Sequence, residues 1–219
     1  MTATASPSYR PKVSGLTIRR LLLASGNPGK LVELSRFLGE LPIQVLSPAL
    51  AGITLPEVEE DGATFQENAE KKALSAAGVC GPEIPALADD SGLQVDALNG
   101  APGVRSARFA GHTGTRAQRD AANNRHLLHL LAGIPQARRT ARFVCVLAVA
   151  SAGTIAITAT GEVNGIILSA PRGEGGFGYD ALFMYPPAGK TFAQMSSAEK
   201  LSVSHRGKAL MAMRTALSG

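Results

Sequence analysis

The 219-residue sequence has no tryptophan, only 5% aromatic residues and two cysteines. Cys80 and Cys145 do not form a metal-binding pattern. Cys145 lies inside the apolar run 143–150, so we expect a buried thiol in a reducing compartment. The scarcity of cysteine therefore argues against both a disulfide scaffold and a cysteine-bound metal.

Long apolar runs are also missing. The longest, residues 21–24 and 143–150, are far shorter than the roughly 18 residues that a membrane-spanning helix needs. We therefore expect no membrane partner and a cytoplasmic location.

A large excess of one charge is absent from most of the chain. The net charge is +5, but residues 1–20 contain four basic residues and no acid, so the remainder is close to neutral. A basic nucleic-acid-binding face is not implied, and we expect no nucleic-acid partner. We predict a disordered basic extension at 1–17, where Pro and Gly interrupt any helix, and a single folded domain at 18–219.

The remaining sequence alternates between strand and helix patterns and predicts an α/β fold. Strands are predicted at 18–24, 43–46, 143–150 and 154–160, the last two as a hairpin. Helices are predicted from residue 28, at 64–77, at 115–131, and as one helix after the capping box that begins at Ser196.

Two adjacent carboxylates, Asp89 and Asp90, follow the apolar residues 86–88 and precede Ser91 and Gly92. We expect a buried strand to end at these acids, with a tight turn between two strands as the alternative. Successive strand residues point to opposite faces, so we expect one acid to do the chemistry and the other to act as a brace.

Residues 25–30, with the sequence SGNPGK, join the first predicted strand to the first predicted helix. Asn27 suits a helix N-cap and Pro28 the first helical position. Such a junction directs backbone N–H groups and the positive end of a helix dipole toward an anion, with Lys30 beside them. It predicts either a phosphate site or an ordinary strand-to-helix turn.

Other polar segments leave two alternatives each. The acidic run 57–61 is either a solvated helix flank or a source of a cation ligand. Arg105 and Arg108 either contact an anion or are solvated. The same two alternatives apply to the basic residues within 200–208. The loop 171–180 is dense in glycine and should place Phe177 and Tyr179 in the open, where a ring can stack on a base.

Six motifs, taken in order, resemble those of the inosine triphosphate pyrophosphatase family, also called Ham1-like. They are SGNPGK (25–30) with Glu33, TFQENA (64–69) with Lys72 and Ala73, ADDSGL (88–93), GAPGV (100–104) with residues 106–108, GGFGYD (175–180) and SHRG (204–207). The resemblance covers nearly everything after residue 17.

The resemblance implies an elongated mixed β-sheet flanked by helices, with two lobes around an active-site cleft, usually in a homodimer. It implies Mg²⁺-dependent hydrolysis of ITP, dITP and XTP to the monophosphate and pyrophosphate, which cleanses the nucleotide pool. A Maf-type nucleotide pyrophosphatase with other substrates, or a nucleotide- or RNA-binding sensor without turnover, are the alternatives.

The resemblance also implies roles for individual residues. Asp90 matches the general base and a metal ligand, and Glu60, with Glu59 as the alternative, is expected to be the second metal carboxylate. The implied substrate-binding residues are Ser25, Gly26, Asn27, Pro28, Gly29, Lys30, Ser91, Phe177, Gly178, Tyr179, Asp180, Lys200, His205 and Arg206.

Overall fold

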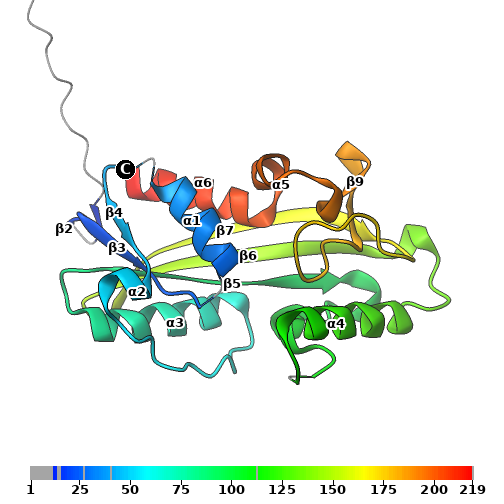
Figure 1. The fold of residues 1–219 in the computed structure, drawn as a ribbon, viewed down its shortest axis with the longest axis horizontal. Coiled ribbons are helices and arrows are strands. Elements are labelled where there is room, and N and C mark those ends of the chain that lie inside the picture. The colour runs from blue at the N-terminus through cyan, green and yellow to red at the C-terminus, as the bar shows by residue number, and fades with distance from the viewer. Residues whose placement is uncertain (1–11, 14–15, 27, 40, 112, 219) are drawn as a thin grey trace, which may run out of the picture.

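The computed structural model of the protein describes residues 12–13, 16–26, 28–39, 41–111 and 113–218. They form an elongated molecule in which one mixed sheet of seven strands carries helices on both faces (Figure 1). The predicted α/β class and the elongated, helix-flanked mixed sheet are confirmed. Among the helices of these residues, none is long and apolar enough to cross a bilayer.

The strands are β1 (Lys12–Val13), β2 (Leu16–Thr17), β3 (Arg20–Leu23), β4 (Gln44–Leu46), β5 (Ala86–Val95), β6 (Thr140–Ser151), β7 (Thr154–Ile167), β8 (Phe183–Tyr185) and β9 (Lys190–Thr191). The α-helices are α1 (Pro28–Leu38), α2 (Pro48–Ala51), α3 (Phe65–Cys80), α4 (Arg116–Leu130), α5 (Ser197–Val203) and α6 (His205–Ser218). The 3₁₀ turns are η1 (Asp96–Leu98), η2 (Gly103–Arg108), η3 (Gln136–Arg138), η4 (Pro186–Ala188) and η5 (Phe192–Gln194).

The large sheet has the strand order β4-β3-β5-β6-β7-β8-β9. β3 is parallel to both β4 and β5, and every later pair is antiparallel. The predicted hairpin is β6–β7, and it is longer than its apolar core because the pairing continues to Thr140 and Ile166.

Residues 89–92 lie inside β5, where neither a strand end nor a turn is found. β5 pairs with β6 along its whole length, from Ala86 opposite Ala150 to Val95 opposite Ala141. The predicted strand end and the alternative turn are both wrong. Pairing along the full strand outweighs the local turn preference of the Asp-Ser-Gly sequence.

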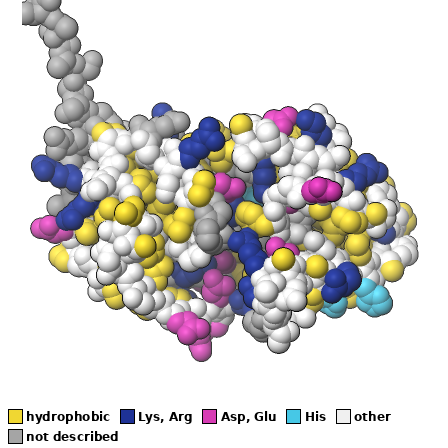
Figure 2. Space-filling view, viewed as in Figure 1, with side chains coloured by type: hydrophobic (Ala, Val, Ile, Leu, Met, Phe, Trp, Pro, Cys, Tyr) yellow, Lys and Arg dark blue, Asp and Glu magenta, His cyan; other side chains and the backbone are white. Residues whose placement is uncertain are grey.

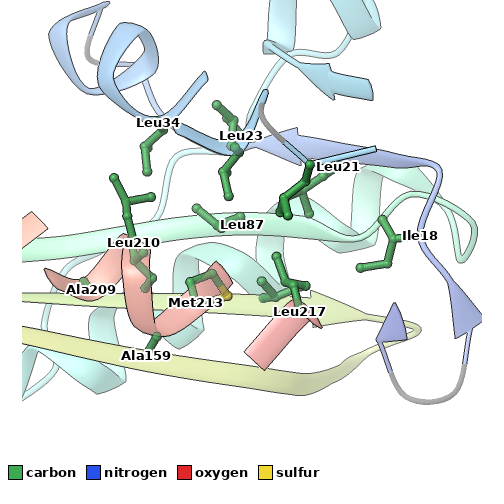
Figure 3. Close-up of a cluster of buried hydrophobic side chains, with 14 of the residues drawn as sticks. Ile18, Leu21, Leu23, Leu34, Leu87, Ala159, Ala209, Leu210, Met213 and Leu217 are labelled. Carbon is green, nitrogen blue, oxygen red and sulfur yellow. The ribbon is translucent and has the colours of Figure 1, made fainter. Parts of the chain in front are cut away.

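The two faces of the sheet are covered by different helices. α3 and α4 run one after the other along one face, and α1 and α6 cover the other (Figure 1). On the α1 and α6 side, Leu34, Leu210 and Met213 pack with Leu23 and Leu87 in a buried cluster (Figure 3). On the α3 side, alanines at helical spacing pack against the alanines of β5, which lets the helix lie close to the strand.

The chain after Ser196 forms two helices where one was predicted. α5 ends at Val203, and Ser204 has an extended backbone with φ −73° and ψ 161° before α6 begins at His205. A Cβ at Gly207 would lie 1.7 Å from the carbonyl oxygen of Leu201, so only glycine allows this close crossing of α5 and α6. The break places His205 and Arg206 in the first turn of α6.

Part of the predicted extension is described by the structure. β1 and β2 form a short antiparallel hairpin inside residues 1–17, and β1 lies beside α6. Residues 1–11 lie outside the described residues, and the boundary at residue 17 stays a prediction.

Candidate active site

The site begins where β3 stops and β5 continues. β3 pairs with β5 only at Ala86 and Leu87, and among the described residues no strand pairs with the next part of β5 on that side. Asp89 and Asp90 follow directly along this open edge. The carboxyl end of a parallel strand at such a point is where α/β sheets commonly bind ligands. Figure 2 shows acidic and basic side chains together in the hollow across this part of the molecule.

Asp89 points to the α1 and α6 face of the sheet. Its Oδ2 lies 2.7 Å from Nζ of Lys30 and 3.7 Å from Nη2 of Arg206. Burial by itself would raise the pKa of Asp89, but the charges of Lys30 and Arg206 outweigh burial and hold the pKa below its ordinary value. Asp89 is therefore ionised and braces two cations, as expected for one of the two acids.

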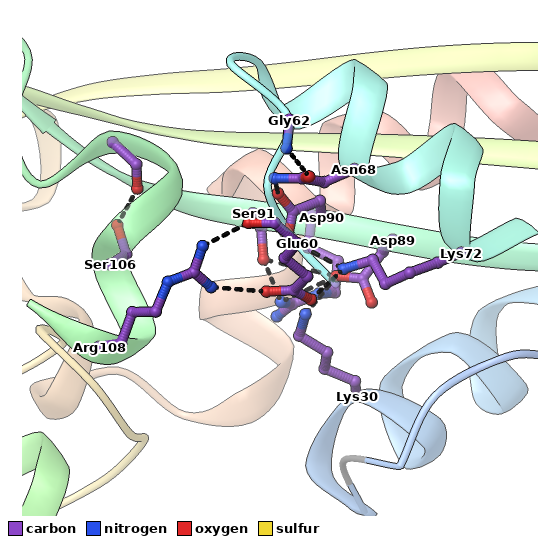
Figure 4. Close-up of polar contacts among 12 residues, drawn as sticks. Lys30, Glu60, Gly62, Asn68, Lys72, Asp89, Asp90, Ser91, Ser106 and Arg108 are labelled. Carbon is purple, nitrogen blue, oxygen red and sulfur yellow. Dashed lines mark hydrogen bonds and ion pairs between the residues drawn. The ribbon is translucent and has the colours of Figure 1, made fainter. Parts of the chain in front are cut away.

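Asp90 points to the opposite, α3 face. Its Oδ1 accepts a hydrogen bond from Nζ of Lys72 at 3.0 Å, and its Oδ2 accepts one from Nδ2 of Asn68 at 3.3 Å (Figure 4). Burial raises the pKa of Asp90, and the nearby charge of Lys72 only partly offsets it. This carboxylate is held less strongly in its charged form than Asp89, which suits a group that must accept a proton.

Glu60 joins the same group of charges from an irregular segment before α3. Its Oε1 lies 2.8 Å from Nζ of Lys72, and its Oε2 lies 3.2 Å from Nη1 of Arg108. Burial would raise the pKa of Glu60, but Lys72 and Arg108 outweigh burial and lower the pKa. Glu59, in contrast, is exposed. Of the two candidates, only Glu60 is linked to Asp90, through Lys72. We call Glu60, Asp90 and Lys72 the acid centre.

A cavity of about 390 Å³ lies beside the acid centre, within the size range of small-molecule sites. Its lining brings together ten of the predicted substrate-binding residues: Gly26, Lys30, Ser91, Phe177, Gly178, Tyr179, Asp180, Lys200, His205 and Arg206. Ser25, Asp90 and Glu60 do not line it. Asn27 lies outside the described residues, as do the side chains at positions 28 and 29. Gly92 also lines the cavity, where a Cβ would lie 2.4 Å from Oγ of Ser106.

The junction at residues 24–30 has the predicted form. β3 ends at Leu23 and α1 begins at Pro28, so the first turn of the helix follows the strand within a few residues. Lys30, in that turn, is bonded to Asp89 and faces the cavity. An ammonium group has three donors, so Lys30 can keep Asp89 and still bind an anion.

The glycine-rich loop is held firmly by the residues around it. Asp180 Oδ2 accepts from the Phe177 N–H at 2.8 Å and from Nζ of Lys200 at 2.5 Å. Phe177 is half-exposed, as expected, but Tyr179 is only 4% exposed, and its hydroxyl donates to the Ser106 carbonyl at 2.8 Å. The prediction that Tyr179 is open for stacking is wrong, because its ring packs in the core and its hydroxyl anchors the loop.

Three cationic or polar side chains from α5 and α6 form another wall of the cavity. Lys200, His205 and Arg206 are all buried. The ring of His205 is parallel to that of Phe143, with centroids 4.7 Å apart. Burial, and then the charges of Arg206 and Lys200, lower the pKa of His205 well below its ordinary value, so the imidazole is neutral.

Two buried nitrogens in this wall lack partners. Within the described chain, neither Nδ1 of His205 nor Nε of Arg206 has a hydrogen-bond partner. Buried polar atoms are nearly always bonded in folded proteins. Both residues line the cavity, although the two unpaired nitrogens are themselves buried.

The sequence pointed less directly to several residues that build the site. Asn68 and Lys72 lie four residues apart on α3 and both reach Asp90. Asn68 is fully buried beside the alanine stripe of the helix, and an asparagine on an apolar face is the signal that could have identified it. On α4, Asp120 accepts from the Gly178 N–H and Asn124 donates to the Gly178 carbonyl, both at 2.9 Å.

Comparisons with known proteins agree on one family. The sequence matches the profile of the Ham1 family over residues 21–216. A dITP/XTP pyrophosphatase of Syntrophobacter fumaroxidans is 53% identical over 89% of this chain and 80% of that protein. One from Desulforamulus reducens is 54% identical over 87% of this chain and 92% of that protein.

Solved structures give the same result. The structure of a HAM1 protein from Coxiella burnetii has a TM-score of 0.80 and 39% identity, covering 91% of this chain and 98% of that one. A nucleoside-triphosphatase, also described as a dITP/XTP pyrophosphatase, from Mycobacterium abscessus has a TM-score of 0.71 and 42% identity, covering 89% and 98%. The site therefore lies on a known scaffold, and this chain belongs to the Ham1 family.

Proposed function

We propose that the protein hydrolyses deaminated purine nucleoside triphosphates, namely dITP, ITP and XTP, to the monophosphate and pyrophosphate. Relatives about half identical over most of the chain are dITP/XTP pyrophosphatases, and the six motifs on which the resemblance rests occur in order along the chain. This reaction removes damaged purines from the nucleotide pool.

One observation carries the proposal: the acid centre adjoins a cavity large enough for a nucleoside. Ser91 lines the cavity, and the preceding residue, Asp90, belongs to the acid centre. A nucleotide whose base occupies the cavity would extend its phosphates past Ser91 toward Asp90, Lys72 and Lys30. The positive charges of the two lysines would offset the charge of a triphosphate.

A divalent ion, which we propose to be Mg²⁺, fits the acid centre. Glu60 and Asp90 direct carboxylate oxygens toward one cation, the ammonium of Lys72. Within the described residues, no group of three or more His, Cys, Asp or Glu side chains could hold a metal by itself. Two carboxylates, completed by water and phosphate oxygens, are the usual ligand set of Mg²⁺ beside a nucleotide. When bound, the ion would offset the charge that develops on the leaving pyrophosphate.

Asp90 is the proposed general base. Its raised pKa makes it a better proton acceptor than an ordinary aspartate. Asn68 holds Oδ2 at 3.3 Å, and this contact fixes the orientation of the carboxylate toward an attacking water. A positioned base of this kind commonly contributes about 10²- to 10⁴-fold to the rate.

The cavity walls are proposed to select the base. Phe177 offers a ring for stacking, with Lys200 and Arg116 within 5 Å of its centroid. His205 and Arg206 line the same cavity and carry N–H donors. A donor from this pair would bond the 6-carbonyl of hypoxanthine or xanthine, and the amino group of adenine would leave it unpaired, a difference of about 1–3 kcal/mol.

The decisive experiment is pyrophosphate release from ITP, XTP, dITP, GTP, ATP and dTTP, with and without Mg²⁺. We expect Mg²⁺-dependent release from the first three, lost in Asp90→Asn. Asp96→Asn is the matched control, since Asp96 directly follows the same strand but accepts a hydrogen bond from Thr140. Release from dTTP in preference to ITP would support the Maf-type alternative, and normal activity of Asp90→Asn would contradict the mechanism.

The homodimer implied by the resemblance stays a prediction. Sedimentation equilibrium of the full chain would test it.

A further inference from the structure

Lys72 occupies the place between the two proposed metal carboxylates. Its side chain is 17% exposed, and Nζ lies 2.8 Å from Oε1 of Glu60 and 3.0 Å from Oδ1 of Asp90 (Figure 4). Two carboxylate partners at hydrogen-bond distance stabilise the protonated form of a lysine amine. The group between the two acids is therefore a positively charged ammonium.

Each of the four oxygens of these two carboxylates accepts a hydrogen bond. Glu60 Oε2 accepts from Arg108 and Asp90 Oδ2 accepts from Asn68, which leaves Oε1 and Oδ1 for Lys72. These two oxygens converge on one point, the Lys72 ammonium, so a divalent ion held by both carboxylates would take the same position. An ammonium and a divalent ion cannot share that space, because two positive charges at a few ångströms repel strongly where water is partly excluded.

A bound nucleotide would offer the Lys72 ammonium an alternative partner. Lys72 ends a flexible four-carbon chain, and the proposed path of the phosphates passes between Lys72 and Lys30. A phosphate oxygen can replace both carboxylates as the partner of the ammonium. Arg108 and Asn68 would keep Glu60 and Asp90 in place while the lysine moves.

We propose that Lys72 is a resident counter-ion that keeps the divalent-metal site closed in the nucleotide-free protein, and that the triphosphate opens the site by drawing the ammonium away. The inference rests on the proposed function, because it needs a phosphate-bearing ligand at this place. It makes metal and nucleotide binding mutually dependent, since each binds better after Lys72 has left the acids.

The test is Mn²⁺ binding to the metal-free, full-length protein without nucleotide, followed by calorimetry and by the EPR signal of free Mn²⁺. We expect Lys72→Met to bind one Mn²⁺ at least about tenfold more tightly than wild type, because a positive charge has been removed from between the ligands. Lys71→Met is the matched control. Lys71 is the adjacent residue, is exposed and pairs with Asp61, so the Mn²⁺ affinity of this variant should equal that of wild type.

Two further measurements make the result specific. The double variant Lys72→Met/Asp90→Asn should lose the gain in affinity, which places the ion at the acid centre. With the α,β-methylene analogue of ITP present, the advantage of Lys72→Met over wild type should vanish or reverse, because the nucleotide has displaced Lys72 in the wild type. Lys72→Gln repeats the test with a polar side chain, and circular dichroism verifies the fold of each variant.

Equal Mn²⁺ affinity of wild type and both folded Lys72 variants without nucleotide would overturn the inference. A gain that survives Asp90→Asn, or that persists unchanged with the analogue, would overturn it as well. These measurements need no turnover, so they are separate from the pyrophosphate-release assay. A protein that fails that assay can still show the gain in Mn²⁺ affinity, and an active enzyme can lack it.

Discussion

Asp89 and Asp90 are adjacent in β5, yet their carboxylates lie on opposite faces of the sheet. Oδ2 of Asp89 lies 2.7 Å from Nζ of Lys30, and Oδ1 of Asp90 lies 3.0 Å from Nζ of Lys72. The pKa of the first is lowered and that of the second is raised. Two neighbouring residues of the same type thus have opposite pKa shifts because the pleat of one strand gives them different surroundings.

The same contrast predicts unequal effects of the two substitutions on the free energy of unfolding. Asp89→Asn leaves Arg206, which is 2% exposed, with one fewer charged partner, and we expect it to lower the free energy of unfolding by about 3 kcal/mol and Tm by about 10 °C. Asp90→Asn should change the free energy by less than about 1 kcal/mol, because folding already disfavours the charged form of Asp90. Thermal unfolding of the two variants measures the difference. Equal losses would show that Asp89 is not the brace.

The raised pKa of Asp90 predicts the acid side of the pH profile. A base must be deprotonated, so kcat/KM falls as the pH drops through the pKa of Asp90, and the midpoint should lie above the ordinary 3.8. Lys72 lowers this pKa, so Lys72→Gln should move the Asp90 titration to higher pH. Carboxyl ¹³C NMR of the metal-free protein measures it directly. Lys71→Gln serves as the control, and a midpoint at or below 3.8 in the wild type contradicts the prediction.

The link between α4 and the glycine-rich loop predicts an effect on substrate affinity. Asp120 accepts the Gly178 N–H at 2.9 Å, and this bond holds the loop that carries Phe177. Asp120→Ala should raise the KM for ITP about tenfold, as expected from loss of one hydrogen bond to a charged group, with little change in kcat. Asp120→Asn keeps an acceptor oxygen and should retain most of the affinity. A fall in kcat with KM unchanged would show that the loop acts in the chemical step.

Phe177 predicts a second, distinct loss of affinity. Base stacking on an aromatic ring is worth about 1–3 kcal/mol by alanine substitution, so Phe177→Ala should raise KM for ITP, XTP and dITP by similar factors. Phe177→Tyr keeps the ring and should remain close to wild type. Steady-state kinetics with the three substrates test this, and an unchanged KM in Phe177→Ala would remove Phe177 from the binding site.

Most of the elements could be predicted from local patterns. Thr64 as the N-cap of α3, the leucines of α1 and the β-branched residues of β6 and β7 each define their element within a few neighbouring residues. The exceptions depend on contacts far along the chain. Residues 89–92 are strand because β6 pairs with them, and the helix breaks at Ser204 because α6 must lie close against β7, where a Cβ at Gly161 would be 2.2 Å from the carbonyl oxygen of His205.

The candidate site was predictable as a list of residues but not as an arrangement. The resemblance named Lys30, Ser91 and His205, and the cavity brings them together. It could not show that Tyr179 is buried and donates a hydrogen bond to the Ser106 carbonyl. Nor could it show that Lys72 lies between Glu60 and Asp90. These facts depend on the placement of α3 and η2 against β5, which no short stretch of sequence encodes.

The continuity of β5 through the site has a consequence for which bond is cut. Ser91 borders the proposed nucleoside cavity and Asp90 belongs to the acid centre, so one peptide unit of a strand that pairs with β6 along its whole length separates the two. In the proposed mechanism, β5 therefore sets how far from the nucleobase along the nucleotide the attacking water is held. A flexible loop at this place would allow the water held by Asp90 to reach either anhydride bond of the triphosphate. A rigid strand would allow it to reach only one of the two bonds.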